Sequence, residues 1–496
     1  MKIKNEHYIL ALIFLLTFGA RLYFAFGTEN FTYNSYFNIR QAENIRETML
    51  PVFDDELSFS GRSLVFMPFF HYTLAFFDIF LPIDFVAKVI PNLFASLIII
   101  IVFYLSKEIT KDKEAALFAS FISGFLPIFF IETIISVSVY SLLLPLMILL
   151  LYFFVKIKHG EKYIKYFIIT LIIATLTNPS IFFLIVTLLI YLIIGKLEHL
   201  KIRKSEVELI TFSTFIVVFI LYLFYKQALI MHGASVIWQN IPKIIMQNHF
   251  KEISLLEAIY KIGLIPFFSA LYITYRSFFK ERNKYNFILV SFGISIAFML
   301  WFKLISLVNG VMFLGIISIL LFADFYRILF GYIGKTKVSL LKKPFMFFLF
   351  LIIIITSVIP SLYYSTLKIE TAPTETEINA LRWIKENTDE HDIILSPVKE
   401  GFIINYASKR KNIIDSNFIL ITDASQRVED IETIYTTQFK TNAIELLTKY
   451  NIKYIYLSDK IRKDFAVGEL RYYDDICFEK VYNKGVVIYK SLCRLE

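Results

Sequence analysis

Long runs of apolar residues, broken by short charged segments, occupy the chain up to about residue 366. A helix needs about 20 such residues to cross a bilayer. The pattern predicts about eleven membrane-spanning helices, near residues 8–26, 86–106, 114–131, 135–155, 163–177, 179–195, 209–225, 257–275, 286–303, 308–326 and 344–364. The first run contains Arg21, and no clear small-residue cleavage site follows it, so we interpret it as a span rather than a signal peptide.

The apolar stretch 64–81 differs from these runs, because Pro68 and His71 interrupt it. Counting it as a span would move the basic run 107–113 to the outer side and invert every later loop. We therefore predict a re-entrant or interfacial helix on the outer face of the membrane, a form that such segments often take.

Lysine and arginine residues in the loops predict the orientation of the chain. With the N-terminus in the cytoplasm, the inner segments hold 22 Lys and Arg residues, whereas the short outer loops hold three, Lys226, Lys243 and Lys251. An excess of basic residues is typical of cytoplasmic loops. An odd number of spans then places the C-terminus outside the cytoplasm.

Two domains follow from this topology. Residues 1–366 are predicted to form a polytopic α-helical membrane domain with large outer loops at 27–85 and 226–256. From Glu370 the composition becomes that of a soluble domain, and residues 367–496 are predicted to form an extracytoplasmic domain. Outer loops of this size are unusual unless they are functional.

Helical and strand patterns alternate in the C-terminal domain. Helices are predicted at 375–387, 401–408, 424–436 and 440–450, and strands at 392–395, 412–414, 452–457, 477–482 and 486–490. The last two strands read as a hairpin that turns at Gly485. This alternation is typical of a small α/β domain with a largely parallel sheet.

The two cysteines of the chain, Cys477 and Cys493, both fall in this domain. Their predicted extracytoplasmic location permits a disulfide. The expected hairpin register, however, places Cys477 opposite residues 490–492 rather than 493, and this register favours two separate thiols.

Composition agrees with a membrane protein and excludes other classes. Hydrophobic residues make up 57% of the chain and charged residues 19%, compared with about 45–50% and about 25% in soluble proteins. The chain has 13 Pro, 16 Gly and two Cys, which excludes disorder, a collagen-like fibre and a disulfide scaffold. The net charge is +9, but the basic residues lie in short runs between apolar stretches, so we expect no nucleic-acid binding.

The first outer loop holds three adjacent acidic residues, Asp54, Asp55 and Glu56. Divalent cations prefer carboxylate oxygens, so Asp54 and Asp55 are candidate ligands of Mg²⁺ or Mn²⁺. A carboxylate can equally act as a base on an acceptor hydroxyl. The alternative is a solvated acidic turn between two helices. Since no Ser/His/Asp, zinc or phosphate-loop pattern is present, we expect any catalytic group among the acids of the outer face.

Several segments then follow one another in a recognisable order. They are Asn34–Arg40 (NSYFNIR), 53–58 (FDDELS), Gly61-Arg62, 68–72 (PFFHY), Lys88–Pro91 (KVIP), 380–385 (ALRWIK) and 443–456. In this order they resemble segments of the GT-C membrane glycosyltransferases, especially the oligosaccharyltransferase catalytic subunit. The resemblance implies a GT-C helical bundle whose first outer loop carries an acid. It also implies transfer of a sugar or glycan from a polyprenyl-phosphate carrier on the outer face of the membrane.

The chain departs from this family at its acidic positions. The position of the first-loop Asp is occupied by Asn34, and that of the family's His by Asn38. A second acidic motif would fall at Val139 and Ser141, neither of which is acidic. The Trp-Trp-Asp-Tyr-Gly signature that reads the acceptor sequon is replaced by residues 396–402 (SPVKEGF). These departures argue against an oligosaccharyltransferase proper.

Candidate site residues remain at the outer face. The candidate catalytic residues are Asp54, Asp55, Glu56, Glu29 and Glu252, the last of which lies where the family often keeps a mobile-loop Glu. The candidate residues for binding the donor phosphate are Arg62, Lys88 and Lys303, because cations at the membrane surface attract phosphate. Structural anchoring is the alternative role for each of these cations.

Three functions compete for this sequence. The favoured one is a membrane glycosyltransferase that transfers a sugar from a polyprenyl-phosphate-linked donor to a lipid, glycan or protein acceptor. The second is a non-catalytic GT-C relative that binds a lipid-linked glycan or assists a glycosyltransferase as a partner, and the loss of the acid at Asn34 favours it. The third is a transporter or flippase, which predicts inverted repeats that the sequence does not show.

Overall fold

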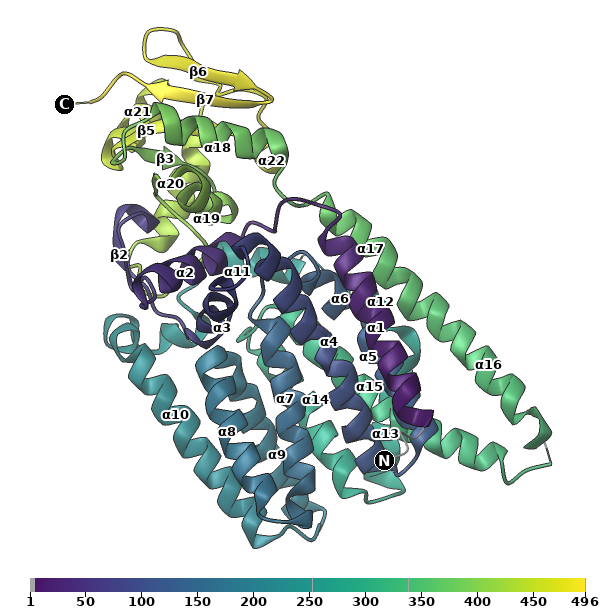
Figure 1. Ribbon diagram of the computed structural model, residues 1–496. Helices are drawn as coiled ribbons and strands as arrows, with labels where there is room; N and C mark the ends of the chain where they lie inside the picture. The colour runs from purple at the N-terminus through teal and green to yellow at the C-terminus, as the bar shows by residue number, and fades with distance from the viewer. Residues whose placement is uncertain (1–4, 252, 338, 496) are drawn as a thin grey trace.

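The computed structural model describes residues 5–251, 253–337 and 339–495. Most of the chain forms an α-helical bundle, and a smaller domain that contains a β-sheet lies on one end of this bundle (Figure 1). The N-terminal helix begins at the other end (Figure 1). The two ends of the described chain are therefore separated by the length of the bundle.

Nine helical segments in the described chain are long and apolar enough to cross a membrane. They are α1 (Asn5–Ala25), α4 (Ile83–Thr110), α5 (Lys113–Gly124) with α6 (Pro127–Thr133), α7 (Tyr140–Lys156), α9 (Phe182–Leu197), α10 (Lys204–His232), α14 (Lys284–Trp301), α15 (Leu307–Ile333), and α16 (Lys342–Ile353) with α17 (Ile359–Ile369). A pair bent by 94°, α12 (Leu255–Ile262) and α13 (Leu264–Phe279), makes ten if it is counted as one span. The remaining predicted span, 163–177, is the 16-residue helix α8 (Lys162–Thr177).

The first outer loop folds into short elements above the bundle. They are α2 (Ser35–Thr48), β1 (Asp54–Asp55), β2 (Arg62–Ser63) and α3 (Phe69–Asp78). The predicted re-entrant helix corresponds to α3, which has ten residues and is too short to span a bilayer. Its buried face, which includes Phe70 and Leu74, packs against α2 and α4. The loop is therefore a folded layer on the bundle.

The C-terminal domain follows the predicted element order closely. Its elements are α18 (Glu375–Asn387), β3 (Ile393–Leu395), α19 (Gly401–Ile403), β4 (Lys411–Asn412), α20 (Ala424–Thr436), α21 (Lys440–Lys449), β5 (Ile452–Leu457), α22 (Asp459–Asp464), β6 (Phe478–Lys484) and β7 (Val486–Ser491). A capping box begins α18, because the Thr374 side chain accepts from the Glu377 amide while the Glu377 carboxylate accepts from the Thr374 amide.

The sheet of this domain has the strand order β4-β3-β5-β7-β6 and is mixed. β3 is parallel to β4 and β5, whereas β7 is antiparallel to β5 and β6. The prediction of a largely parallel sheet is wrong, because the C-terminal hairpin inserts next to β5 and adds two antiparallel pairs. The hairpin turns at Gly485, whose φ of 80° is rarely adopted by residues with a side chain.

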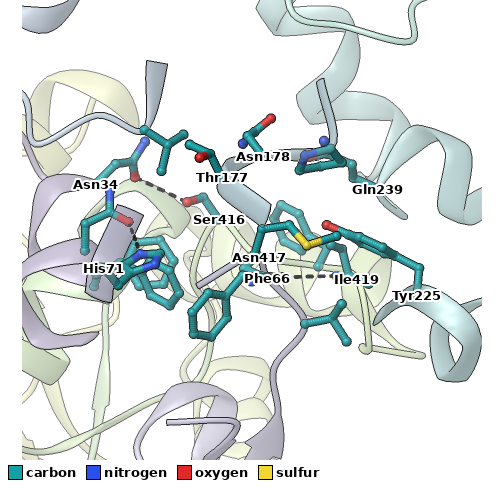
Figure 2. Close-up of a pocket in the computed structure, with 18 residues that line it drawn as sticks. Asn34, Phe66, His71, Thr177, Asn178, Tyr225, Gln239, Ser416, Asn417 and Ile419 are labelled. Carbon is teal, nitrogen blue, oxygen red and sulfur yellow. Dashed lines mark hydrogen bonds between the residues drawn. The ribbon is translucent and has the colours of Figure 1, made fainter. Parts of the chain in front are cut away.

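The two outer loops and the C-terminal domain contact one another at one end of the bundle. Asn412 of β4 donates its backbone N–H to the Leu57 carbonyl oxygen (2.9 Å) and accepts from the Phe59 N–H at its side-chain oxygen (2.8 Å). The Asn240 side chain, in the second outer loop, donates to the carbonyl oxygens of Phe418 (3.0 Å) and Ile421 (2.6 Å). The same junction encloses a cavity (Figure 2).

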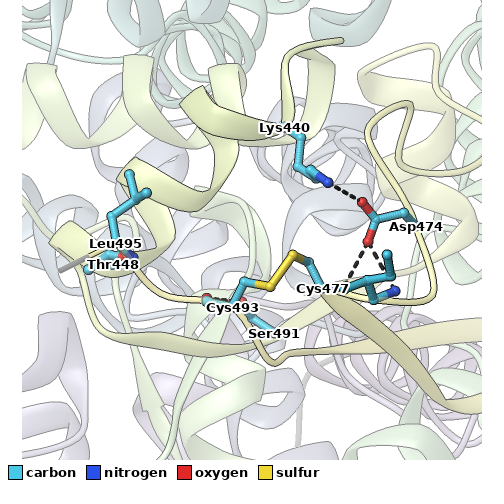
Figure 3. Close-up of a disulfide and its surroundings, with 8 residues drawn as sticks. Lys440, Thr448, Asp474, Cys477, Ser491, Cys493 and Leu495 are labelled. Atoms are coloured by element: carbon cyan, nitrogen blue, oxygen red, sulfur yellow. Dashed lines mark hydrogen bonds and ion pairs between the residues drawn. A yellow bond between two sulfur atoms is a disulfide. The ribbon is translucent and has the colours of Figure 1, made fainter.

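Cys477 and Cys493 form a disulfide (Figure 3), with their Cα atoms 4.8 Å apart. The expected register is close, since the Leu492 amide donates to the Cys477 carbonyl oxygen (2.8 Å). The expectation of separate thiols is nevertheless wrong. Because β7 ends at Ser491, Cys493 no longer follows the strand ladder and comes back toward Cys477.

Candidate functional site

A cavity of about 310 Å³ lies where the first outer loop, the bundle and the C-terminal domain meet (Figure 2). Its polar lining residues are Asn34, Asn38, His71, Thr177, Asn178, Tyr225, Gln239, Ser416 and Asn417. Four phenylalanine residues contribute aromatic surface, namely Phe37, Phe66, Phe402 and Phe418. The described residues that line this cavity include no Asp, Glu, Lys or Arg. The cavity is therefore polar and aromatic but uncharged.

Asn34 joins two walls of the cavity. It immediately precedes α2, and its side-chain oxygen accepts a hydrogen bond from the Ser416 hydroxyl (3.2 Å), which belongs to the C-terminal domain. Figure 2 shows this bond across the cavity. Within the described chain the Asn34 amide nitrogen donates to no protein atom, so its two N–H groups are available to a bound molecule.

Asn38 and His71 form a fixed pair in the same wall. The Asn38 nitrogen donates to the Val137 carbonyl oxygen (2.7 Å), so its oxygen faces the His71 Nε2 atom (2.7 Å). This oxygen can only accept, and the His71 proton therefore lies on Nε2. Burial lowers the pKa of His71 to about 3. The imidazole is neutral at physiological pH and is too weak a base to deprotonate an alcohol efficiently.

The three adjacent acids of the first outer loop lie outside the cavity lining. Asp54 is exposed and accepts from the Ser63 hydroxyl (2.7 Å), and Glu56 is also exposed. Asp55 is buried, and its two oxygens accept from the two terminal nitrogens of Arg40 at 2.7 and 2.8 Å. This bidentate pair holds α2 against the β1–β2 turn.

The expected Asp54–Asp55 metal site does not fit this arrangement. Both oxygens of Asp55 are bound by Arg40, and Asp55 also accepts from the Leu57 amide (3.0 Å). In residues 5–251, 253–337 and 339–495, no group of three or more His, Cys, Asp or Glu side chains is placed to hold a metal ion. We therefore assign no step of a reaction to a metal.

The structure does not bring the other predicted site residues that it describes into the cavity lining. Glu29 is exposed just after α1, and Glu252 lies outside the described residues. The Lys88 ammonium donates to the Thr28 carbonyl oxygen (2.7 Å) and so fixes the start of the loop. Lys303 is exposed just after α14 in a left-handed backbone conformation (φ 56°).

Arg62 connects the first outer loop to the C-terminal domain. Its side chain is 5% exposed and forms an ion pair of 2.8 Å with Asp415, which is fully buried. It also donates to the Ser58 hydroxyl (2.7 Å) and the Asn417 carbonyl oxygen, and it lies over the Phe59 ring. The Ser58 hydroxyl in turn donates to Asp415. Because residues 416 and 417 line the cavity, this clamp (Ser58, Arg62 and Asp415) positions part of the cavity wall.

A buried acid, Glu400, lies elsewhere in the contact between the first outer loop and the C-terminal domain. Glu400 is 1% exposed and accepts from the Ser458 hydroxyl (3.0 Å). Nearby, Glu377 accepts from the Tyr33 hydroxyl (3.0 Å) of the first outer loop. Burial, and then the negative charge of Glu377, raise the pKa of Glu400 to about 8, although Lys460 opposes the shift. Glu400 therefore keeps its proton at neutral pH in the folded chain.

From the sequence, Asn34 and Asn38 were singled out only as positions where a family residue is replaced, and most of the other polar lining residues were not selected. Asn178 comes between two predicted spans, at an end where polar residues are expected in any membrane protein. Ser416 and Asn417 follow β4 at the carboxyl edge of the parallel part of the sheet, where ligands commonly bind. The position of these two residues at that edge could have identified them as candidate ligand-binding residues. The contact of Ser416 with Asn34 could not have been predicted, because the two residues are 382 positions apart in the sequence.

Comparisons with known proteins agree with this architecture. A family model described as dolichyl-phosphate-mannose-protein mannosyltransferase matches residues 67–225. No curated protein sequence matches the chain significantly. The sequence match is thus confined to the part of the chain from α3 to α10.

Solved structures match over a much larger part of the chain. The Archaeoglobus fulgidus oligosaccharyltransferase in complex with Zn and sulfate has a TM-score of 0.70 at 17% identity, over 90% of this chain and 67% of that one. The same organism's AglB, in complex with an inhibitory peptide and a dolichol-phosphate, has a TM-score of 0.70 at 16% identity, over 91% and 69%. ArnT from Cupriavidus metallidurans bound to undecaprenyl phosphate has a TM-score of 0.54 at 10% identity, over 97% of both chains. The chain shares its fold with these proteins.

Proposed function

We propose that this chain, which has the GT-C membrane fold, is a membrane glycosyltransferase that takes a sugar from a polyprenyl-phosphate carrier at the outer face of the membrane. The uncharged polar and aromatic cavity is the observation that carries the proposal. Amides, hydroxyls and a neutral imidazole donate and accept hydrogen bonds, as sugar hydroxyls require. Aromatic rings provide apolar faces for the C–H surfaces of a sugar. A cavity of about 310 Å³ is at the small end of the range for ligand sites.

The carrier is inferred from proteins of the same fold. One of them holds undecaprenyl phosphate and another a dolichol-phosphate, and the matching family model is described as a dolichyl-phosphate-mannose-protein mannosyltransferase. These observations support a polyprenyl-phosphate-linked sugar as the donor. The predicted orientation supports an extracytoplasmic site, because the cavity lies at the end of the bundle that carries the C-terminal domain (Figure 1).

The proposed reaction breaks the bond between the anomeric carbon of the sugar and the phosphate oxygen of the carrier. The anomeric carbon bonds to an acceptor oxygen, whose proton goes to a base, and the polyprenyl phosphate leaves. His71 is unsuited to this role because of its low pKa. Of Asp54 and Asp55, Asp54 is the better candidate, since Arg40 holds both oxygens of Asp55. Glu252 is the candidate in the second outer loop.

A second function has one specific observation in its favour. No carboxylate is present among the described residues that line the cavity. The resemblance noted in the sequence implies that Asn34 occupies the position of a family acid. A protein with this cavity and no base would bind the sugar of a lipid-linked glycan and present it to another enzyme. The two functions share the binding step and differ in turnover.

The experiment that separates them uses the purified full chain in lipid nanodiscs. A panel of polyprenyl-phosphate sugars is offered with lipid, glycan and peptide acceptors, with added Mg²⁺ or Mn²⁺ and with a chelator. We expect transfer by the wild-type chain, a large loss with Asn178→Ala, and no loss with the control Asn379→Ala, an exposed asparagine on α18. Asp54→Asn tests the base. Saturable donor binding without turnover would replace the first function by the second, and absence of both would refute both.

A further inference from the structure

A second cavity, of about 420 Å³, lies at the other end of the bundle. It is formed by the end of α7, the following turn 157–159, the connection 198–203 between α9 and α10, and the first residues of α10 and α14. Its lining residues are Phe154, Val155, Lys158, Lys201, Ile202, Arg203, Glu206, Lys284, Tyr285 and Ile288. In Figure 1 these helix ends lie far from the C-terminal domain. This basic cavity is therefore separate from the proposed sugar site.

The charge of the basic cavity is strongly positive. Four cations line it, against one carboxylate, Glu206. Both oxygens of Glu206 are already bound, one by the Lys284 ammonium (2.7 Å) and the other by the Tyr191 hydroxyl (3.3 Å). Lys284 also donates to the Lys201 carbonyl oxygen (3.1 Å), which holds the 198–203 connection in place. Glu206 therefore offsets one lining cation, and three remain.

Lys158 is only partly neutralised by its ion-pair partner. The partner is Glu108, 3.2 Å from the Lys158 ammonium. The same carboxylate also pairs with Lys156 (2.9 Å) and Lys111 (2.6 Å). One negative charge is thus shared among three lysines, so an excess of positive charge remains beside the cavity.

Lys201 and Arg203 are exposed, and within the described chain neither side chain forms an ion pair. Arg203 is also the N-cap residue of α10, and its side chain caps no backbone amide. A second helix, α14, begins at Lys284 in the same lining. Helix N-termini carry partial positive charge and bind anions. Two cations that form no ion pair in the described chain, and the first residues of two helices, therefore line one cavity.

The other lining residues are mainly apolar. Phe154, Val155 and Ile288 are buried residues of the bundle, and Tyr285 receives a hydrogen bond from Lys158. A small hydrated anion gains nothing from such a wall, whereas a lipid that carries a phosphate and acyl chains would contact both parts. We infer that this cavity binds the phosphate headgroup of an anionic membrane lipid in the leaflet opposite the sugar site. Basic pockets between membrane helices are known to recognise such headgroups.

The test is lipid retention, measured by native mass spectrometry on the purified full chain reconstituted with equal amounts of phosphatidylglycerol and phosphatidylcholine. We expect the wild-type chain to retain phosphatidylglycerol preferentially. In the double variant Lys201→Gln/Arg203→Gln, the ratio of retained phosphatidylglycerol to phosphatidylcholine should fall about tenfold, because each basic residue near an anionic lipid contributes appreciably to binding. Each single variant should show a smaller decrease in the preference for phosphatidylglycerol than the double variant. Since neither residue forms an ion pair in the described chain, folding should be retained.

The matched control is Lys335→Gln/Lys337→Gln. These two exposed lysines lie in the connection between α15 and α16, outside the cavity, and their loss changes the net charge by the same amount. The control should keep the wild-type preference, and equal losses in both double variants would overturn the proposal in favour of general surface charge. In a second arm, inorganic phosphate is added. Displacement of phosphatidylglycerol by a few-fold molar excess of phosphate would assign the site to a soluble anion and would also overturn the proposal.

Discussion

Replacing Asp415 by alanine should open the contact between the first outer loop and the C-terminal domain. The ion pair of Asp415 with Arg62 is almost completely buried, with side-chain exposures of 0% and 5%. Asp415→Ala would leave the guanidinium buried without a counter-charge, and removing one partner of a buried pair costs about 3–5 kcal/mol. It would also remove the acceptor of the Ser58 hydroxyl and of the Asn417 amide.

Hydrogen exchange measured by mass spectrometry reports the loss of local stability at the backbone amides of the contact. In the folded chain the Phe59 amide is bound to the Asn412 side chain and the Gly61 amide to the Ser58 carbonyl. If exchange proceeds through local opening, a loss of about 3 kcal/mol accelerates exchange of this segment about 10²-fold. Amides in the middle of the bundle should keep their wild-type rates.

Two further variants make the result specific to the buried pair. Asp459→Ala removes a partner of an ion pair whose acid is 74% exposed, and exchange should change by no more than about twofold. Arg62→Met/Asp415→Leu removes both charges and should recover much of the protection, because two apolar residues leave no unpaired charge. Wild-type exchange at residues 57–64 in a folded Asp415→Ala protein would refute the assignment of this pair as the clamp.

Three other changes have defined outcomes. Asn34→Asp should lower sugar transfer about tenfold at neutral pH, since it replaces an N–H donor by a charge in an uncharged cavity, and higher transfer in kinetic assays would contradict this. Glu400 keeps its proton up to about pH 8 when folded but ionises near 4.5 when unfolded, so stability should fall as pH rises between these values. Glu400→Gln should abolish that fall in thermal unfolding from pH 5 to 8, and an unchanged slope would exclude Glu400 as its source. Cys477→Ser/Cys493→Ser should destabilise the C-terminal domain by about 3 kcal/mol in denaturant unfolding, as expected for a 16-residue separation, and equal stability of variant and wild type would show that the disulfide contributes nothing.

Local signals explain why so much of the fold was predictable from the sequence. The apolar runs locate the bundle helices, and the Thr374–Glu377 capping box locates the start of α18 at the predicted residue. Gly485 similarly fixes the turn of the last hairpin. The insertion of β7 beside β5 was not predictable in this way, because strand neighbours are set by packing over the whole domain. The disulfide depends on the path of the chain after Ser491, which no periodic pattern encodes.

The candidate site shows the limit of the same reasoning. Charged residues were selected as candidates because the chemistry of a charged side chain can be recognised from the residue alone. In the structure, however, the candidate acid Asp55 is paired with Arg40, and the candidate cation Arg62 is paired with Asp415. Uncharged amides such as Asn178 give no comparable signal until the fold brings them together. Asn34 was identified only through its position in a family motif. The clamp also explains why a charged residue in an outer loop need not bind a ligand.

One wall of the cavity that contains Asn34 comes from residues 416–419, which follow all the membrane helices in the chain. Proteins are made from the N-terminus, and domains generally fold in that order. A nascent chain whose spans have all been inserted therefore still lacks this wall, and the Asn34 side chain still lacks its partner Ser416. The cavity is complete only when the last domain has been synthesised and folded, so a chain that stops early during translation cannot form the site.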